Sequence, residues 1–265
     1  MMQYPIKIGT RSSKLALTQT QLVKQALAKV HPDFAEPEAV YIHAVLTSGD
    51  IHNQTPLYDI GGKALFCKEI DQLLLNGKLD FAVHSLKDVP TWLPEELTIA
   101  AVLPRASALD CLISTAGYSI QDLPKQAVIG TSSLRRRAQL LALRPDLQIK
   151  PLRGNVPTRL EKLTQAYDAI VLAHAGLERL ALTDRYPCQV LPPETFIPAA
   201  SQGAVGLVCH KDNTAIQQLL SPLNDAVSAE RIQCERAFLD ILQGSCKTPI
   251  GAYAAYQDDQ LCCKQ

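Results

Sequence analysis

A run of polar side chains directly follows a short apolar segment and could form one edge of a ligand site. Phe81–Val83 is apolar and predicts a buried strand, and His84–Asp88 adds four polar side chains before Pro90. Pro90 stops a regular element because it lacks an N–H and disfavours a helical conformation at the preceding residue. In open α/β sheets, ligands bind beyond the carboxyl ends of the strands. The run therefore predicts ligand contacts, although a loop whose charges face water would have the same composition.

Arginine is concentrated in a later segment. Between residues 130 and 160 the only acidic residue is Asp146, and the basic residues are Arg135, Arg136, Arg137, Arg144, Lys150, Arg153 and Arg159. Several follow predicted strands, and arginine is suited to two-point binding of carboxylate or phosphate. With Arg11 and Arg179, they predict a cleft for a polyanion. We expect ligand contacts from Arg135, Arg136 and Arg153, and surface positions for Arg137 and Arg144.

One of the eight cysteines lies in a setting that favours reactivity. Cys246 precedes Lys247 in a segment rich in Gly, Ser and Pro, where the positive charge favours the thiolate. Cys67, Cys111 and Cys209 lie in apolar runs and are predicted to be core residues. The sequence has no Cys-x-x-Cys pair and no zinc-like His/Cys spacing, so we expect no metal site.

Composition limits the classes to which the chain can belong. Of its 265 residues, 47% are hydrophobic, which predicts two or three packed domains. Lys+Arg and Asp+Glu each total 26, and no basic stripe with interleaved aromatics occurs, which argues against nucleic acid as a partner. The N-terminus lacks a signal-peptide pattern, and no apolar run is long enough to span a bilayer. We therefore expect a soluble cytoplasmic protein without a membrane partner.

Apolar periodicity predicts strands that alternate with helices, and hence an α/β fold with a largely parallel sheet. Predicted strands are 6–9, 39–46, 81–83, 97–103, 127–130, 148–152, 169–172, 204–209 and 250–256. Predicted helices are 14–30, 67–75, 134–143, 155–164, 175–180, 214–220 and 225–242. Polar residues 47–50 follow the second strand, and a proline-rich connector spans 191–199.

A short motif occurs at two strand-to-helix junctions. Residues 8–13 (IGTRSS) and 129–133 (IGTSS) share Ile-Gly-Thr and Ser-Ser. The match is short enough to arise by chance, but it predicts two similar βα domains. Each would offer a helix N-terminus, whose free N–H groups and dipole bind anions.

Five segments, in order along the chain, resemble the porphobilinogen deaminase (hydroxymethylbilane synthase) family. They are residues 84–90 (HSLKDVP), 130–136 (GTSSLRR), 152–156 (LRGNV), 202–206 (QGAVG) and 244–251 (GSCKTPIG). The resemblance implies two lobes like those of periplasmic binding proteins and a small α+β third domain. It places domain 1 at 1–103 plus 200–221, domain 2 at 104–199, and an incomplete domain 3 at 222–265.

The resemblance also implies an activity. The family condenses four porphobilinogen molecules head to tail, releases ammonia and frees the linear tetrapyrrole hydroxymethylbilane by hydrolysis. Its members are therefore transferases. Its primer is a covalent dipyrromethane cofactor, held by a thioether that would here involve Cys246. The family further suggests a monomer.

Residue roles follow from the matching positions. Asp88 matches the catalytic carboxylate, which would stabilise the positive charge that develops when ammonia leaves. Cofactor contacts match Lys87, Ser13, Ser133, Arg135, Arg136 and Asp88, and substrate contacts match Arg11, Arg153, Arg159, Arg179 and Gln202. Lys63 and Phe66 match a loop that would cover the cleft.

The chain departs from the family near its end, since it stops about 14 residues after Gly251, and we expect the third domain to lack its last strand and helix. Two rival classes are compatible with the fold: a two-lobed anion binder or sensor, and a nucleic-acid-binding regulator. Asp88 and Cys246 favour the enzyme over a binder, which needs neither.

Overall fold

A computed structural model of the chain describes residues 5–51, 65–245 and 248–265. Within these ranges the chain divides into two compact units. The first contains residues 5–51, 65–105 and 204–233, and the second contains residues 106–203, 234–245 and 248–265. The chain thus leaves the first unit and later returns to it. The three-domain boundaries implied by the resemblance stay a prediction.

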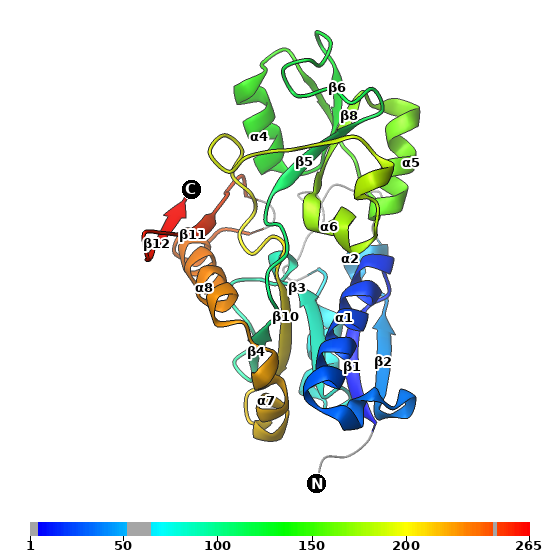
Figure 1. Cartoon of the computed structure of the whole chain (residues 1–265), viewed down its shortest axis with the longest axis vertical. Helices are drawn as coiled ribbons and strands as arrows, with labels where there is room; N and C mark the ends of the chain where they lie inside the picture. Colours follow the sequence, from blue (N-terminus) through cyan, green and yellow to red (C-terminus); the bar gives the residue numbers. More distant parts are fainter. Residues whose placement is uncertain (1–4, 52–64, 246–247) are drawn as a thin grey trace. The chain divides into compact units, whose positions relative to one another are not determined.

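The described part of the first unit contains a sheet with the strand order β2-β1-β3-β10-β4 (Figure 1). Its strands are β1 (Ile6–Arg11), β2 (Val40–Val45), β3 (Phe81–Ser85), β4 (Leu97–Val102) and β10 (Val205–His210). β1 runs parallel to β2 and β3, whereas β10 pairs antiparallel with β3 and β4. Strands β1, β2, β3 and β4 therefore run in one direction, which confirms the prediction of a largely parallel sheet. Only β10 is reversed, because it belongs to the returning segment and inserts between β3 and β4.

The second unit has a sheet with the order β7-β6-β8-β5-β9. Its strands are β5 (Asp110–Ser114), β6 (Val128–Gly130), β7 (Gln148–Lys150), β8 (Ala169–Ala173) and β9 (Cys188–Val190). β6 is parallel to β7 and β8, whereas β5 is antiparallel to β8 and β9. The two sheets therefore share one topology, which confirms the two similar βα units that the repeated motif predicted. β5 and β9 were not predicted from the sequence.

Helices cover the sheets. They are α1 (Lys14–Val30), α2 (Ser48–Ile51), α3 (Lys68–Leu75), α4 (Leu134–Leu143), α5 (Val156–Ala166), α6 (His174–Arg179), α7 (Thr214–Leu220) and α8 (Ala226–Ile241). Short 3₁₀ helices are η1 (Pro32–Ala35), η2 (Pro37–Ala39), η3 (Leu86–Asp88), η4 (Thr183–Arg185) and η5 (Ser221–Leu223). Among the helices described, none is both long and apolar enough to cross a membrane.

Alternating strand residues supply two core layers in each unit, as expected from the twofold period of a strand. In the second unit, Val171 of β8 packs in one cluster with Leu140 of α4, and its neighbour Leu172 packs in another with Leu160 of α5. α4 and α5 accordingly cover opposite faces of the sheet (Figure 1). In the first unit, α1 and α3 take the corresponding places, because their residues join separate clusters with β3.

The two repeated junctions form equivalent helix caps. The Ser13 side chain accepts a hydrogen bond from the Ala16 N–H at 3.3 Å, at the start of α1. The Ser133 side chain accepts one from the Arg136 N–H at 3.4 Å, at the start of α4. Serine is preferred at such positions because its oxygen satisfies a backbone donor that the helix leaves unpaired.

The chain ends in a hairpin of β11 (Tyr253–Gln257) and β12 (Gln260–Lys264). Asp258 and Asp259 have φ of 47° and 61°, both positive as in a type I′ turn. The fully buried Glu235 of α8 fixes the hairpin, since it accepts a hydrogen bond from the Ala254 N–H at 2.8 Å. Strand β12 lies where the sequence offered no interpretable pattern.

Candidate active site

The turn that follows β3 presents Asp88. The 3₁₀ helix η3 follows β3 without a gap, in agreement with the prediction that the strand gives way to a polar turn. Leu86 is fully buried and packs on Gly206 of β10, where an added Cβ would lie 2.3 Å from the Leu86 Cδ2 atom. Leu86 therefore anchors the turn, while the Asp88 side chain is 28% exposed. Lys87 beside it is half-buried.

Arg11, the last residue of β1, contacts two carboxylates. Its Nη1 lies 3.5 Å from Asp88 Oδ2, and its Nε donates to Asp50 Oδ2 at 3.1 Å. Its Nη2 also donates to Asp50 Oδ1. The three residues meet because β2 and β3 flank β1 in parallel, so that the segments after these strands lie at one edge of the sheet.

Arg11 and Asp50 stabilise one another in their charged forms. Burial alone would lower the pKa of Arg11, but the hydrogen bond to Asp50 and the charge of Asp88 raise it. Burial alone would raise the pKa of Asp50, but Arg11 and Thr47 hold it below its usual value. Thr47 Oγ1 donates to Asp50 Oδ2 at 2.8 Å. Arg11 and Asp50 are therefore both ionised at neutral pH.

Two residues just before α3 contact Arg11 and Asp88. The Phe66 ring faces the Arg11 guanidinium, with 4.2 Å from Cζ to the ring centroid. Cys67 Sγ lies 3.5 Å from the backbone oxygen of Asp88 and 3.8 Å from Nδ1 of His84. Burial, and secondarily the charge of Arg11, lowers the pKa of His84 to about 4, so its ring is neutral at pH 7.

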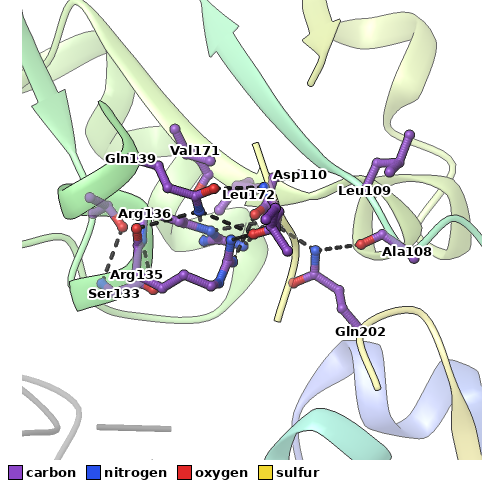
Figure 2. Close-up of polar contacts among 12 residues, drawn as sticks. Ala108, Leu109, Asp110, Ser133, Arg135, Arg136, Gln139, Val171, Leu172 and Gln202 are labelled. Atoms are coloured by element: carbon purple, nitrogen blue, oxygen red, sulfur yellow. Dashed lines mark hydrogen bonds and ion pairs between the residues drawn. The ribbon is translucent and has the colours of Figure 1, made fainter. Parts of the chain in front are cut away.

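A second polar cluster is buried in the second unit (Figure 2). We call it the Asp110 cluster; it consists of Asp110, Arg135, Arg136 and Gln202. Asp110 Oδ2 accepts from Arg135 Nη2 at 2.7 Å. Its Oδ1 accepts from Arg136 Nη2 at 2.6 Å and from Gln202 Nε2 at 2.9 Å. All four residues are buried, and Asp110 is completely so.

The Asp110 cluster carries an excess of positive charge. Burial alone would raise the pKa of Asp110, but Arg136 and Arg135 hold it far below its usual value. Burial lowers the pKa of Arg135, although the charge of Asp110 opposes this. One carboxylate against two guanidinium groups leaves a net charge of +1. Such a charge attracts anions to the neighbouring surface.

The other predicted arginines of the second unit make separate contacts. Arg159 Nε donates to the Gly154 carbonyl at 2.6 Å, and Arg179 Nη2 donates to the Gly203 carbonyl at 2.6 Å. Arg153 is buried. Each of these side chains is therefore held by the backbone or the core rather than extended into water.

Arg137 is exposed, as predicted for a surface position. Arg144 is not a freely solvated residue. Its side chain is only 20% exposed, its Nε donates to Asp146 at 2.8 Å, and its Nη1 donates to the Ile120 carbonyl at 3.0 Å. It fastens the end of α4 to the segment before β6.

The structure brings together some of the predicted site residues and not others. Arg11, Phe66 and Asp88 form one group, and Arg135, Arg136 and Gln202 join another through Asp110. Ser13 and Ser133 cap the helices that begin beside these groups. Cys246 and Lys63 lie outside the described residues, so no structure is assigned to them.

Sequence reasoning missed the roles of Asp50, Asp110 and Cys67. Asp50 could have been found, because it belongs to the polar segment after a strand that was predicted. Asp110 gave no such signal, since it begins a strand that was not predicted and lies 25 residues before Arg135. Cys67 was predicted only as a core residue, which its 1% exposure confirms.

The fold defines the class of the protein. Two sheets of one topology, joined by a chain that crosses and returns, match a solved ancestral cationic amino acid solute binding protein. The TM-score is 0.50 at 14% identity, over 87% of this chain and 93% of that one, and this likeness concerns the fold alone. The protein is thus an α/β protein with two periplasmic-binding-protein-like lobes.

Comparisons of the sequence define the family. Residues 6–218 match the family described as porphobilinogen deaminase, dipyromethane cofactor binding domain, and residues 229–264 match its C-terminal domain. A porphobilinogen deaminase of Nitrobacter hamburgensis is 45% identical over 96% of this chain and 80% of its own length. One of Rickettsia prowazekii is 47% identical over 96% of this chain and 84% of its own. The chain belongs to the porphobilinogen deaminase family of transferases, as its motifs predicted.

The described residues fit the cofactor that the family description names. Dipyrromethane built from porphobilinogen units carries acetate and propionate groups, which arginine binds well. The positive Asp110 cluster and the neighbouring Ser133 cap supply a donor set of the right charge.

Proposed function

We propose that the protein condenses four porphobilinogen molecules head to tail, with release of ammonia, into the linear tetrapyrrole hydroxymethylbilane. The Arg11–Asp88 pair carries this proposal, because it holds a partly exposed carboxylate after a central strand. Loss of ammonia from porphobilinogen creates an electron-poor cation. A fixed carboxylate stabilises such a cation, accepts hydrogen bonds from pyrrole N–H groups and can take up a proton.

The residues around Asp88 have distinct roles in this proposal. Arg11 orients Asp88 through one carboxylate oxygen and contributes to substrate binding, while Asp50 fixes Arg11 from the other side. Lys87 and Ser13 contact the cofactor. Phe66 restrains the Arg11 guanidinium and, with Lys63, belongs to the covering loop.

The arginines of the second unit bind the carboxylates of the growing chain. Each added porphobilinogen brings two carboxylates, so elongation requires several cationic partners. We assign cofactor contacts to Ser133, Arg135 and Arg136, and substrate contacts to Arg153, Arg159, Arg179 and Gln202. Because Arg136 already donates from Nε, Nη1 and Nη2 to Asp110 and Val171, its part is mainly electrostatic.

When bound, dipyrromethane supplies the terminal pyrrole to which the first substrate is joined. We propose that Cys246 holds it through a thioether, in keeping with the reactive setting of that cysteine in the sequence. We further propose a cytoplasmic monomer that uses neither nucleic acid nor a membrane as a partner.

The test is the intact mass of the purified, denatured chain. We expect an excess equal to two porphobilinogen-derived pyrroles, which is lost in Cys246→Ser and retained in the control Cys188→Ser. Addition of porphobilinogen to the loaded protein should then release a linear tetrapyrrole. A chain of bare polypeptide mass that releases no tetrapyrrole would instead support the two-lobed anion binder.

A further inference from the structure

Cys67 contacts the candidate catalytic residue through its backbone. The thiol is 1% exposed, and its Sγ lies 3.5 Å from the Asp88 carbonyl oxygen and 3.8 Å from His84 Nδ1. A thiol is a weak donor and a weak acceptor. The S–H can therefore donate to Asp88 while the sulfur accepts from the ring of His84.

The surroundings of His84 fix the direction of these hydrogen bonds. His84 is 95% buried, being 5% exposed, and its Nε2 has no hydrogen-bond partner among the described residues. A hydrogen on Nε2 would be a buried, unsatisfied donor, which is costly. The neutral ring is thus best protonated at Nδ1, where the hydrogen faces Cys67 Sγ. The thiol hydrogen is then left for the Asp88 carbonyl.

The segment that contains Cys67 reaches both members of the Arg11–Asp88 pair. Phe66 lies against the Arg11 guanidinium, and Cys67 contacts the backbone of Asp88. Asp88 is the last residue of η3, and its carboxylate is 3.5 Å from Arg11, a long distance for an ion pair. Its position therefore depends on the backbone of the turn as much as on Arg11.

We propose that Cys67 is a positioning residue for Asp88, and that the chain His84 ring N–H, Cys67 S–H, Asp88 carbonyl fixes the turn that carries the catalytic carboxylate. This inference rests on the proposed function of Asp88. Cys67 itself does not touch substrate, because its side chain is buried. Its removal should misplace the carboxylate without removing any group that binds porphobilinogen.

The experiment compares Cys67→Ala, Cys67→Ser and wild type as cofactor-loaded proteins. We expect Cys67→Ala to lower kcat about fivefold, the effect of one neutral hydrogen bond, with KM for porphobilinogen changed by less than about twofold. Cys67→Ser restores a donor to the Asp88 carbonyl and should recover most of kcat. Loading is checked by intact mass before each assay.

Cys209→Ala is the matched control. Cys209 is also a fully buried cysteine of the first unit, but it pairs with Phe81 at the far end of β3 from Ser85. It should lose stability much as Cys67→Ala does and keep normal kcat. A normal kcat in Cys67→Ala, or a Cys67→Ser variant no better than Cys67→Ala, would overturn the positioning role alone. A loaded wild type that forms no tetrapyrrole would overturn the proposed function and this inference with it.

Discussion

Arg11 divides its hydrogen bonds unequally between two carboxylates. Asp50 binds it through both oxygens and also accepts from Thr47, whereas Asp88 is approached by one guanidinium nitrogen at 3.5 Å. Asp50 is thus the structural counter-ion. Asp88 keeps a carboxylate that is held in place and still exposed enough to face a substrate.

At the residue scale, Asp88→Asn should leave the fold intact and abolish nearly all turnover. The amide has the same shape but lacks the negative charge that stabilises the cation, so we expect a loss of about 100-fold or more in tetrapyrrole formation. The measurement is tetrapyrrole release, with the melting temperature taken in parallel. Asp33→Asn, at an exposed position in η1, is the control. Near-normal turnover in Asp88→Asn would contradict the assignment.

Helix α3 begins with two acidic residues in different surroundings. Glu69 accepts hydrogen bonds from the Ser48 N–H at 2.9 Å and from its hydroxyl, and so ties α3 to α2. Asp71 is only 7% exposed. Burial, and secondarily the charge of Glu69, raises the pKa of Asp71 to about 6.

At the element scale, Asp71→Asn should stabilise the first unit at neutral pH. Because the folded pKa of Asp71 exceeds the unfolded value near 4, the wild type loses stability as the pH rises from about 4 to about 6, and Asn escapes that loss. We expect a gain of about 1–3 kcal/mol at pH 7.5 that vanishes near pH 4. Denaturant unfolding at the two pH values measures it. A gain that is equal at both pH values would contradict this account.

Each unit has its own sheet and core clusters, so each can lose structure separately. In the second unit, the Asp110 cluster joins β5, α4 and the segment before β10. Removing its one carboxylate would leave two buried guanidinium groups without a counter-ion.

At the scale of the whole molecule, Asp110→Asn should therefore weaken the second unit selectively. We expect a loss of about 3–5 kcal/mol, seen as faster amide hydrogen exchange in β6 and β8 than in β1 and β3. Glu194→Gln, which weakens the exposed pair with Lys264 in the same unit, should change exchange little. Uniform acceleration in both sheets would contradict a selective effect.

The stabilisation by Asp110 should also depend on pH. Since its folded pKa lies below the unfolded value, the contribution is complete above about pH 4 and is lost as the pH falls toward the folded pKa. The difference in unfolding free energy between wild type and Asp110→Asn should thus be largest near pH 7 and shrink below pH 4. A difference that does not change with pH would exclude the charge as its cause.

The sequence by itself determined the features that depend on neighbours along the chain. Apolar periodicity located most strands and helices, and Ser13 and Ser133 identified two equivalent helix caps, because these signals act within a few residues. Five motifs placed the chain in its family, and the polar turn after β3 pointed to Asp88. These conclusions needed no knowledge of which strands lie side by side.

Only the tertiary structure decided which distant groups meet. β10 and β5 run antiparallel because each belongs to a segment that arrives from the other unit, and periodicity carries no information on strand order. The partnership of Asp110 with Arg135 follows from that insertion. The approach of Cys67 to Asp88 likewise depends on how α3 packs against β3. Packing brings together residues that are far apart in the chain, as it does for Asp110 and Arg135, whereas a sequence pattern relates only residues that are close along the chain.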